Sequence, residues 1–229
     1  MVNAFSFCLY GHYNPKYYIG LKENIEIINN KFPDFHIYIY CGSDIDKIKF
    51  FEILQQFRDI SNKINIINLN ITGPILMLLR YYPIDNENVD CVFSRDADSR
   101  IGERDEWCIN KFLSSSLILH TIRDHHGHFV KMMGGLSGIK KDIIKYIGSF
   151  SKFVPININA KYNYDQYILS IIYINLKDSL LVHSTKNIFL DKNYELIPME
   201  VNKENFCGQV IDYDSDGKPF YVFDYKPYD

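Results

Sequence analysis

The stretch 89-VDCVFSRDADSR-100 determines how the rest of this sequence is interpreted. Residues 89–94 form an apolar run rich in β-forming residues, which is typical of a buried strand. The run ends in Arg95, Asp96, Asp98 and Arg100. Side chains two residues apart on extended backbone project to the same side. We therefore expect the two carboxylates to lie next to each other at the end of the strand.

Two adjacent carboxylates repel each other unless a cation compensates their charge. A divalent cation does so, and Mg²⁺ or Mn²⁺ held by Asp96 and Asp98 would keep open positions for phosphate oxygens. Arg95 and Arg100 could offset remaining charge or contact phosphate through their planar guanidinium groups. The alternative is a surface turn whose charges form salt bridges, because a D-x-D pattern alone is a weak motif.

Strands and helices alternate from the amino terminus onward. We expect strands at residues 4–9, 36–41, 64–69 and 89–94, separated by helices at about 21–32, 45–60 and 75–82. This alternation predicts an α/β fold with a mainly parallel sheet, flanked by helices and joined by right-handed connections. Ligands of such sheets bind beyond the carboxyl ends of the strands, which is where Asp96 and Asp98 are expected.

The second half of the chain continues with fewer regular signals. We expect helices at 103–114, 141–150 and 164–175, and strands at 117–123, 135–139 and 179–183. Trp107 lies at helical spacing from Phe112, so we expect it to pack in the core. From residue 184 onward the periodicity is poor. No domain boundary is evident, and we expect one domain over residues 1–229.

Composition excludes several classes of protein. The net charge is −3, so no basic field favours nucleic acid. No apolar run approaches the length of a membrane span, and the amino terminus does not resemble a signal peptide. The five cysteines are scattered and form no CxxC pair, which favours free thiols in a reducing compartment. We therefore expect a cytoplasmic protein.

Several later segments could belong to the same site. The segment 120-HTIRDHHGH-128 is compatible with a zinc site, with a pocket wall for phosphate or sugar hydroxyls, or with a solvated loop. Gly134 and Gly135 would let the backbone approach a ligand, or would simply form a tight turn. Asp165 opens a helix and could be only a cap. His183 ends an apolar strand, where a histidine is more often a core residue than a ligand.

Together these segments resemble the metal-dependent glycosyltransferases of the GT-A fold. The pattern is similar to that of small bacterial and large-DNA-virus glycosyltransferase-like proteins. The segments that carry it are 17-YYIGLKENI-25, Arg80, 95-RDADSR-100, Arg104, Trp107, 120-HTIRDHHGH-128, 134-GGLSG-138 and Gly208-Gln209. In one departure, Asp105 stands where the pattern has glutamate, which puts an ion pair with Arg104 in doubt.

The resemblance implies a single GT-A-like domain whose residues have specific roles. Residues 1–100 would bind the nucleotide, and residues 101–229 would hold the donor sugar and the acceptor. Asp96, Asp98 and, as in the glycogenin-like group, His183 would hold Mn²⁺ or Mg²⁺. The nucleotide sugar would be contacted by Tyr10, Gly11, His12, Lys16, Tyr17, Arg80, Arg95, Ala97, Arg123, Gly134 and Gly135. Asp165 and Gln166 would face the reacting carbon.

The implied activity is transfer of a hexose from a nucleotide-diphosphate sugar, with UDP favoured, to a hydroxyl of a glycan or another acceptor. The placement of Asp165 and Gln166 resembles that of retaining enzymes, which favours retention of configuration. An inverting reaction would need a base near the acceptor hydroxyl, for which Asp124, Asp165 and His125 are candidates. Two alternatives stay open. One is a nucleotidyltransferase, and the other is a catalytically silent sugar-binding or scaffold protein on the same fold.

Overall fold

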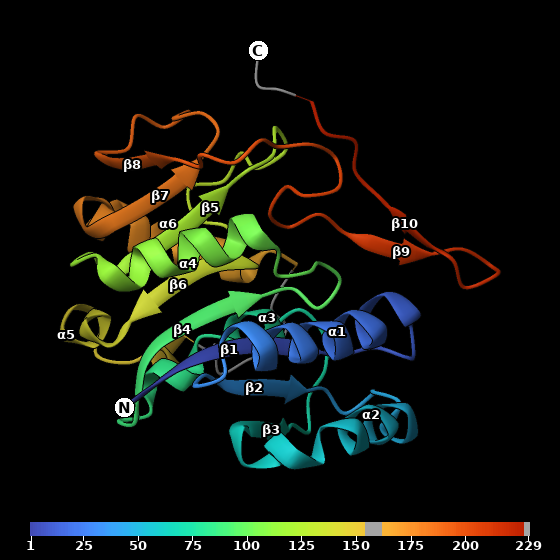
Figure 1. Ribbon diagram of the computed structural model, residues 1–229. Helices are drawn as coiled ribbons and strands as arrows, with labels where there is room; N and C mark the ends of the chain where they lie inside the picture. Colours follow the sequence, from blue (N-terminus) through green and yellow to red (C-terminus); the bar gives the residue numbers. More distant parts are fainter. Residues whose placement is uncertain (154–161, 227–229) are drawn as a thin grey trace.

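The computed structural model describes residues 1–153 and 162–226. Within these residues, eight strands form one sheet in the order β3-β2-β1-β4-β6-β5-β7-β8 (Figure 1). The strands are β1 Val2–Leu9, β2 His36–Cys41, β3 Ile64–Asn68, β4 Val89–Arg95, β5 Leu119–Arg123, β6 Leu136–Lys140, β7 Leu180–Ser184 and β8 Asn193–Leu196. All neighbouring pairs are parallel except those made by β6, which is antiparallel to β4 and β5.

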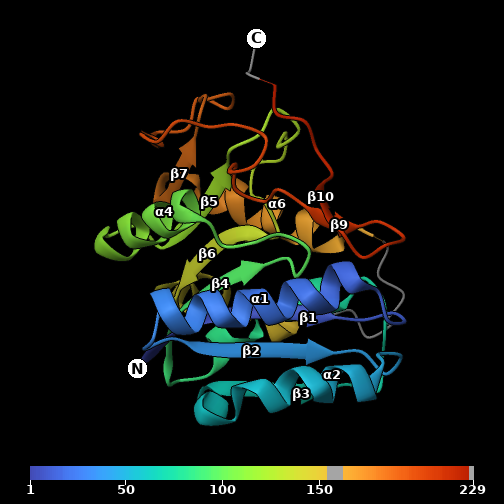
Figure 2. The ribbon, with the colours of Figure 1, turned by 45° about the vertical axis from the view of Figure 1, so that its right-hand side comes forward.

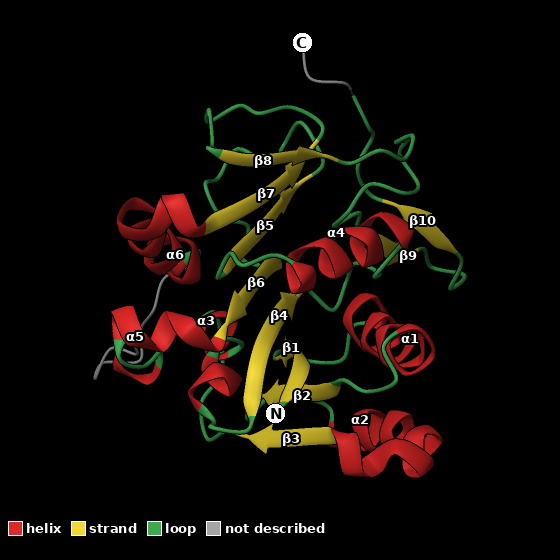
Figure 3. Ribbon diagram, turned by 60° about the vertical axis from the view of Figure 1, so that its left-hand side comes forward, coloured by secondary structure: helices red, strands yellow, loops and turns green. Residues whose placement is uncertain are grey.

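Helices cover both faces of the sheet (Figure 3). One face carries α1 Pro15–Lys31, α2 Lys47–Leu54 and α4 Glu103–Ser114, and the other carries α3 Leu76–Leu79, α5 Ile144–Ile147 and α6 Tyr164–Leu176. Side chains from the sheet pack against each layer, with Phe5, Phe93 and Ile25 in one core and Val92, Ile139 and Leu169 in the other. The predicted α/β fold with a mainly parallel sheet is confirmed.

The order of the strands reverses at the boundary between β1 and β4. From β1 the chain first builds outward through β2 and β3, and β4 then returns to the other side of β1. From β1 the chain continues to β2 on one side of this boundary, and from β4 it continues to β5 on the other side. Ligands of such sheets bind at the carboxyl ends of the strands at such a boundary. Asp96 and Asp98 follow β4 at this point.

The chain after β8 returns to this boundary, which the sequence did not predict. Two short strands, β9 Ile211–Tyr213 and β10 Pro219–Tyr221, form an antiparallel hairpin. The hairpin lies next to α1 and beyond the carboxyl ends of β1 and β4 (Figures 1 and 2). The backbone N–H of Ile211 donates to the carbonyl of Asp98 at 2.9 Å, so the hairpin holds the loop that carries the aspartates.

Two smaller expectations can also be compared with the structure. All five cysteines are free thiols, as predicted. In the described parts of the chain, no helix combines the length and the apolar character that crossing a membrane requires. Trp107 is only partly buried, and it packs against the cluster of Cys108, Ile122 and Leu136.

Candidate active site

A cavity of about 640 Å³ lies at the carboxyl ends of β1 and β4. Three groups of residues form its walls and floor. One wall comes from the loop after β1, with Tyr10, Lys16 and Tyr17. The floor comes from the D-x-D loop, α3 and the start of α6, with Arg80, Asp96, Ala97, Asp98, Asp165 and Gln166. Residues 127–135 and the C-terminal segment, residues 206–224, complete the lining. They contribute His128, Val130, Met133, Gly135, Gly208, Val210, Val222 and Phe223.

The loop after β1 is shaped by local hydrogen bonds. Asn14 caps α1 by accepting from the backbone N–H of Lys16 at 3.0 Å, and Pro15 follows as the first helical residue. The N–H of Gly11 donates to Asp44 at 2.9 Å. This arrangement presents the Lys16 ammonium and the Tyr17 ring to the cavity. A cation and an aromatic ring at this position suit a phosphate and a planar base.

The two aspartates of the D-x-D loop both line the cavity. The Asp96 side chain is 51% exposed and faces Gly135, where an added Cβ would lie 1.9 Å from the carboxylate. Only glycine leaves room for that carboxylate. Asp98 is half-buried, and its pKa is raised to about 6, first by burial and then by the charge of Asp96. This is the electrostatic situation that a bound cation would relieve.

Arg80 ties the floor of the cavity together. Its side chain is buried, and its guanidinium forms an ion pair with Asp96 and lies 3.4 Å from the carboxylate of Asp165. The same group donates to the carbonyls of Met77 and Arg95 at 3.0 and 3.1 Å. Burial raises the pKa of Asp165, although the Arg80 guanidinium opposes that rise. One buried cation thus positions carboxylates from two distant parts of the chain.

Asp165 and Gln166 line the cavity at the start of α6. The second carboxylate oxygen of Asp165, Oδ1, is buried and has no hydrogen-bond partner among the described residues. A buried acceptor without a partner is costly, so a ligand hydroxyl would satisfy it. The amide of Gln166 can be oriented so that both its nitrogen and its oxygen have partners. It then donates to the carbonyl of Met132 at 2.7 Å and accepts from the N–H of Gly134 at 2.8 Å. Gln166 therefore holds the glycine loop.

The residues present fit a hard divalent cation that is shared with a ligand. Across residues 1–153 and 162–226, no three His, Cys, Asp or Glu side chains gather as a possible metal-binding group. Asp96 and Asp98 alone would supply carboxylates. Mg²⁺ and similar ions are commonly held by one or two carboxylates, with waters and substrate phosphates completing the shell.

The structure does not bring His183 to these aspartates. Strand β7 lies three strand positions from β4, which is about 14 Å across the sheet. The His183 ring is fully buried, and its Nδ1 lies 2.8 Å from Nε2 of His120. The ring also packs edge-on against Trp107. We therefore correct the prediction that His183 is a third metal ligand. Strand β7 does end at the same edge of the sheet as β4, but it lies three strand positions away from it.

The predicted contacts of Arg95, Arg123 and Asp124 with substrate are also corrected. Arg95 is buried and donates to Asp105 at 2.7 Å, and Arg123 is buried and donates to Asp191 at 2.5 Å. Asp124 is buried too, and it accepts from Arg104 and from the N–H of Cys207. None of these side chains lines the cavity. The ion pair between Arg104 and Asp105 that the sequence put in doubt is not formed, and the structure has the pairs Arg95–Asp105 and Arg104–Asp124 instead.

Four further predicted residues lie near the cavity without lining it. His12 is exposed, and Gly11 contacts Asp44. The carbonyl of Gly134 accepts from the Tyr81 hydroxyl at 2.8 Å. His125, predicted as a possible base, stacks on Phe206 with ring centroids 4.4 Å apart and supports the C-terminal segment.

Sequence reasoning missed the apolar side of the cavity. Val222 and Phe223 come from the segment with poor periodicity, and no motif marks them. Asn163 also lines the cavity and has a left-handed backbone with φ of 68°. A non-glycine residue in this region is uncommon and is often found at functional sites. Its asparagine identity, next to Asp165, was a signal that could have been used.

No protein-family model matches this sequence, and a search of curated proteins finds no match. Solved structures do match the fold. The glycosyltransferase GlyE of Streptococcus pneumoniae is 18% identical, and the match covers 80% of this chain and 45% of GlyE at a TM-score of 0.50. A glycosyltransferase involved in glycosylation of the major capsid of PBCV-1 is 12% identical, with 82% and 84% covered and a TM-score of 0.52.

Two other matches complete the comparison. The mannosyltransferase PcManGT of Pyrobaculum calidifontis, solved with GDP-Man and Mn²⁺, is 11% identical, with 82% of this chain and 58% of that chain covered at a TM-score of 0.54. The 4-diphosphocytidyl-2C-methyl-D-erythritol synthase of Anaerococcus prevotii is 12% identical, with 80% and 87% covered at 0.55. The chain thus spans only about half the length of GlyE and of PcManGT, and at these identities the likeness is one of fold.

Proposed function

We propose that this chain is a glycosyltransferase that moves a hexose from a nucleotide-diphosphate sugar, with UDP favoured, to a hydroxyl acceptor. One observation carries the proposal. The carboxylates of Asp96 and Asp98 face the loop after β1 across the point where the strand order reverses, in a cavity of about 640 Å³. Aspartate oxygens, a lysine and aromatic side chains within one cavity match the diphosphate and base of such a donor.

Each wall of the cavity then has a role. Tyr10, Lys16 and Tyr17 would hold the nucleotide, within the half formed by residues 1–100. Asp96 and Asp98 would hold Mn²⁺ or Mg²⁺, which when bound offsets charge that develops on the departing diphosphate. Residues 101–229 would hold the donor sugar and the acceptor. The unpartnered Oδ1 of Asp165 would accept a hydrogen bond from a hydroxyl of the donor sugar.

The transfer itself needs little chemistry from the protein beyond orientation. The acceptor oxygen bonds to the anomeric carbon, and the bond from that carbon to the diphosphate oxygen breaks with its electron pair. The acceptor proton ends on the departing diphosphate or on water. Of the three predicted bases, Asp165 lines the cavity, whereas Asp124 and His125 do not. Asp165 is also ion-paired to Arg80, and the proposal keeps the retaining course that the resemblance favours.

Release of nucleoside diphosphate from a panel of UDP-, GDP- and CDP-sugars, with Mn²⁺ and with EDTA, tests the proposal. We expect release from donors of one base, lost with EDTA and lost in Asp98→Asn. Asp90→Asn, at the opposite end of β4, should behave as the parent protein. No release from any donor in the panel would contradict the glycosyltransferase proposal and leave the nucleotidyltransferase and the sugar-binding or scaffold protein as the alternatives.

A nucleotidyltransferase is the second candidate, because a cytidylyltransferase-type synthase matches over 87% of its own length. In such an enzyme the oxygen of a sugar phosphate would bond to the α-phosphorus of a nucleoside triphosphate, which gives a nucleotide sugar and releases pyrophosphate. Against it, the loop 10-YGHYNPKYY-18 is aromatic and is neither glycine-rich nor strongly basic, as a triphosphate site would favour. Pyrophosphate release from CTP or UTP with sugar 1-phosphates, in the absence of nucleotide-sugar turnover, would establish this candidate.

A further inference from the structure

The C-terminal segment, residues 206–224, exposes four consecutive large apolar side chains. Phe220, Tyr221, Val222 and Phe223 are 47, 40, 42 and 46% exposed. Apolar side chains gathered on a surface mark binding sites more often than those scattered singly. Two of the four, Val222 and Phe223, line the candidate active site, where Val130 and Met133 join them. Val130, Met133, Val222 and Phe223 form an apolar part of the cavity lining and are called the apolar wall below.

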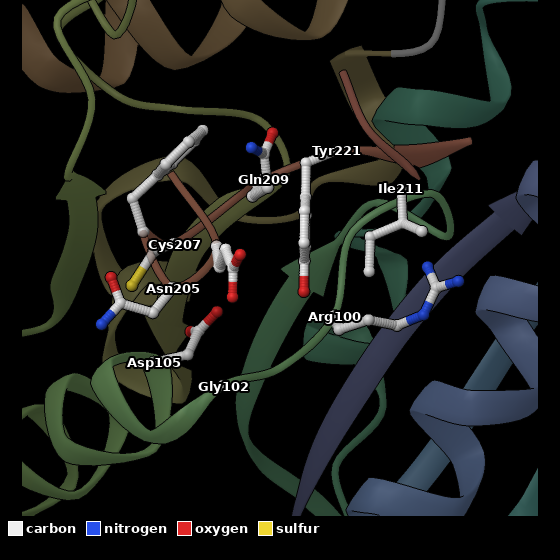
Figure 4. Close-up of a pocket in the computed structure, with 10 residues that line it drawn as sticks. Arg100, Gly102, Asp105, Asn205, Cys207, Gln209, Ile211 and Tyr221 are labelled. Carbon is white, nitrogen blue, oxygen red and sulfur yellow. The ribbon is translucent and has the colours of Figure 1, made fainter. Parts of the chain in front are cut away.

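The other two residues of this run do not contribute to that wall. Tyr221 lines a separate cavity of about 80 Å³, where Figure 4 shows it between Gln209 and Arg100. Phe220 lines neither cavity, although it is as exposed as Phe223. The chain thus provides an internal comparison between two exposed phenylalanines three residues apart.

The apolar wall is held in place before any ligand arrives. The buried amide of Gln209 donates to the carbonyl of Phe223 at 2.6 Å and accepts from its N–H at 3.2 Å. The N–H of Val222 donates to the carbonyl of Val210 at 3.0 Å. Behind the wall, the His125 ring lies 6.1 Å from that of Phe223. A wall fixed in this way binds a ligand with less loss of conformational entropy.

The charges of the segment disfavour an anionic ligand. Its charged residues are Asp212, Asp214, Asp216, Asp224 and a single lysine, Lys218. Two cations line the cavity. Arg80 is buried and paired with Asp96, and the Lys16 ammonium lies 3.8 Å from the carboxylate of Asp212 in this segment. Both cations are therefore already paired with carboxylates, and the side chains of the wall itself, Val130, Met133, Val222 and Phe223, carry no charge. A neutral acceptor with one apolar face and hydroxyls at its edge fits the wall better.

We infer that the apolar wall of Val130, Met133, Val222 and Phe223 is the acceptor subsite. The acceptor is a neutral pyranose sugar whose apolar face packs on the Phe223 ring. The inference rests on the proposed function, since it places the acceptor in the same cavity. Packing of one ring face leaves the hydroxyls at the ring edge free to point toward the donor site. It also accounts for the exposure of Phe223 in a segment that is otherwise firmly hydrogen-bonded.

Methyl pyranosides of neutral hexoses, with the donor found by the hydrolysis panel, serve as acceptor probes. We expect transfer to at least one of them, and Phe223→Ala should raise its KM about tenfold. Phe223→Tyr should restore the KM because it keeps the ring. Phe220→Ala should leave the KM unchanged, and UDP binding with Mn²⁺ should persist in all three variants.

The possible outcomes distinguish a failure of this inference from a failure of the proposed function. If no nucleotide sugar is turned over, the proposed function fails first. If donors are hydrolysed but no methyl pyranoside is glycosylated, or if phosphorylated acceptors are used instead, the neutral-sugar inference is overturned. It is equally overturned if Phe223→Ala transfers with an unchanged KM, or if Phe220→Ala is as defective as Phe223→Ala.

Discussion

Arg95, Arg104 and Arg123 each pair with a carboxylate that lies well apart in the sequence. Their partners are Asp105, Asp124 and Asp191, and all six side chains are buried. Arg95 directly precedes Asp96, but consecutive side chains at the end of a strand face opposite sides. Asp96 therefore reaches the cavity while Arg95 points into the protein. The sequence shows that charge is concentrated near the site, but it does not show which charges neutralise one another.

Arg95 and Asp105 allow this conclusion to be tested. Arg95→Met leaves the Asp105 carboxylate buried without its cation, and we expect it to lower the free energy of unfolding by about 3–5 kcal/mol. Adding Asp105→Leu should recover much of that loss, because no unpaired charge remains. Urea denaturation of the single and double variants measures both values. Lys49→Met, which breaks the exposed pair with Glu52, should leave the stability nearly unchanged.

Asn24 is a second buried residue that acts on the site without lining it. Its amide donates to the carbonyl of Ser99 at 2.7 Å and accepts from the N–H of Ile101 at 3.1 Å. Both backbone groups flank Arg100, immediately after the D-x-D. A helix residue distant in sequence therefore fixes the path of the loop that presents Asp96 and Asp98.

Asn24→Leu should cost about 2–4 kcal/mol of stability, because two buried backbone groups lose their partners. The midpoint of urea denaturation measures this cost. Asn110→Leu, at an exposed position of α4, is the matched control and should be nearly neutral. A neutral Asn24→Leu would mean that the loop finds other partners, and the asparagine would then have no special role in its shape.

Strands β5 and β7 bring together two buried histidines, His120 and His183. Their nitrogens lie 2.8 Å apart within a cluster that includes Phe112 and Trp107. Burial lowers the pKa of His183 to about 4, with Lys111 adding to the effect, and it also lowers the pKa of His120. The carboxylate of Glu195 lies 3.7 Å from the His183 ring but is 46% exposed. Solvent therefore screens its charge, and the imidazole of His183 stays neutral.

These histidines predict a loss of stability in mild acid. In the unfolded chain both take up protons below a pH of about 6.5, whereas in the folded protein His183 stays neutral to about pH 4 and the pKa of His120 is lowered in the same direction. The contribution to stability is therefore complete above pH 6.5 and falls as the pH drops to 4, by about 3 kcal/mol for His183 alone. The double variant His120→Phe, His183→Leu should flatten this part of the stability profile. His12→Gln, at an exposed site, should not, and an equal slope in the double variant would contradict the explanation.

The elements that the sequence predicted best are those with strong, local signals. Strand β2 is found at residues 36–41, as expected, because alternating β-forming residues are bounded there by proline and glycine. Strands β8, β9 and β10 were missed because they have at most four residues and carry no alternating burial. The antiparallel direction of β6 depends on its partners across the sheet, which periodicity does not reveal.

At the scale of the whole molecule, the position of the site follows from the topology. The prediction that Asp96 and Asp98 follow a strand of a parallel sheet was enough to place them at the edge where ligands bind. The prediction for His183 used the same rule but lacked the strand order, and three strand positions separate β7 from β4. The apolar wall from the C-terminal segment could not be anticipated at all, because it depends on the return of the chain after β8.

The central claim is that Asp96 and Asp98 bind a nucleoside diphosphate through a divalent cation. Calorimetric titration of UDP in the presence and absence of Mn²⁺ tests it most directly, with the parent protein, Asp98→Ala and Asp90→Ala. We predict binding by the parent protein that requires Mn²⁺, its loss in Asp98→Ala, and unchanged binding in Asp90→Ala, at the other end of β4. Binding of UDP by Asp98→Ala with the affinity of the parent protein, or binding that ignores Mn²⁺, would contradict the claim.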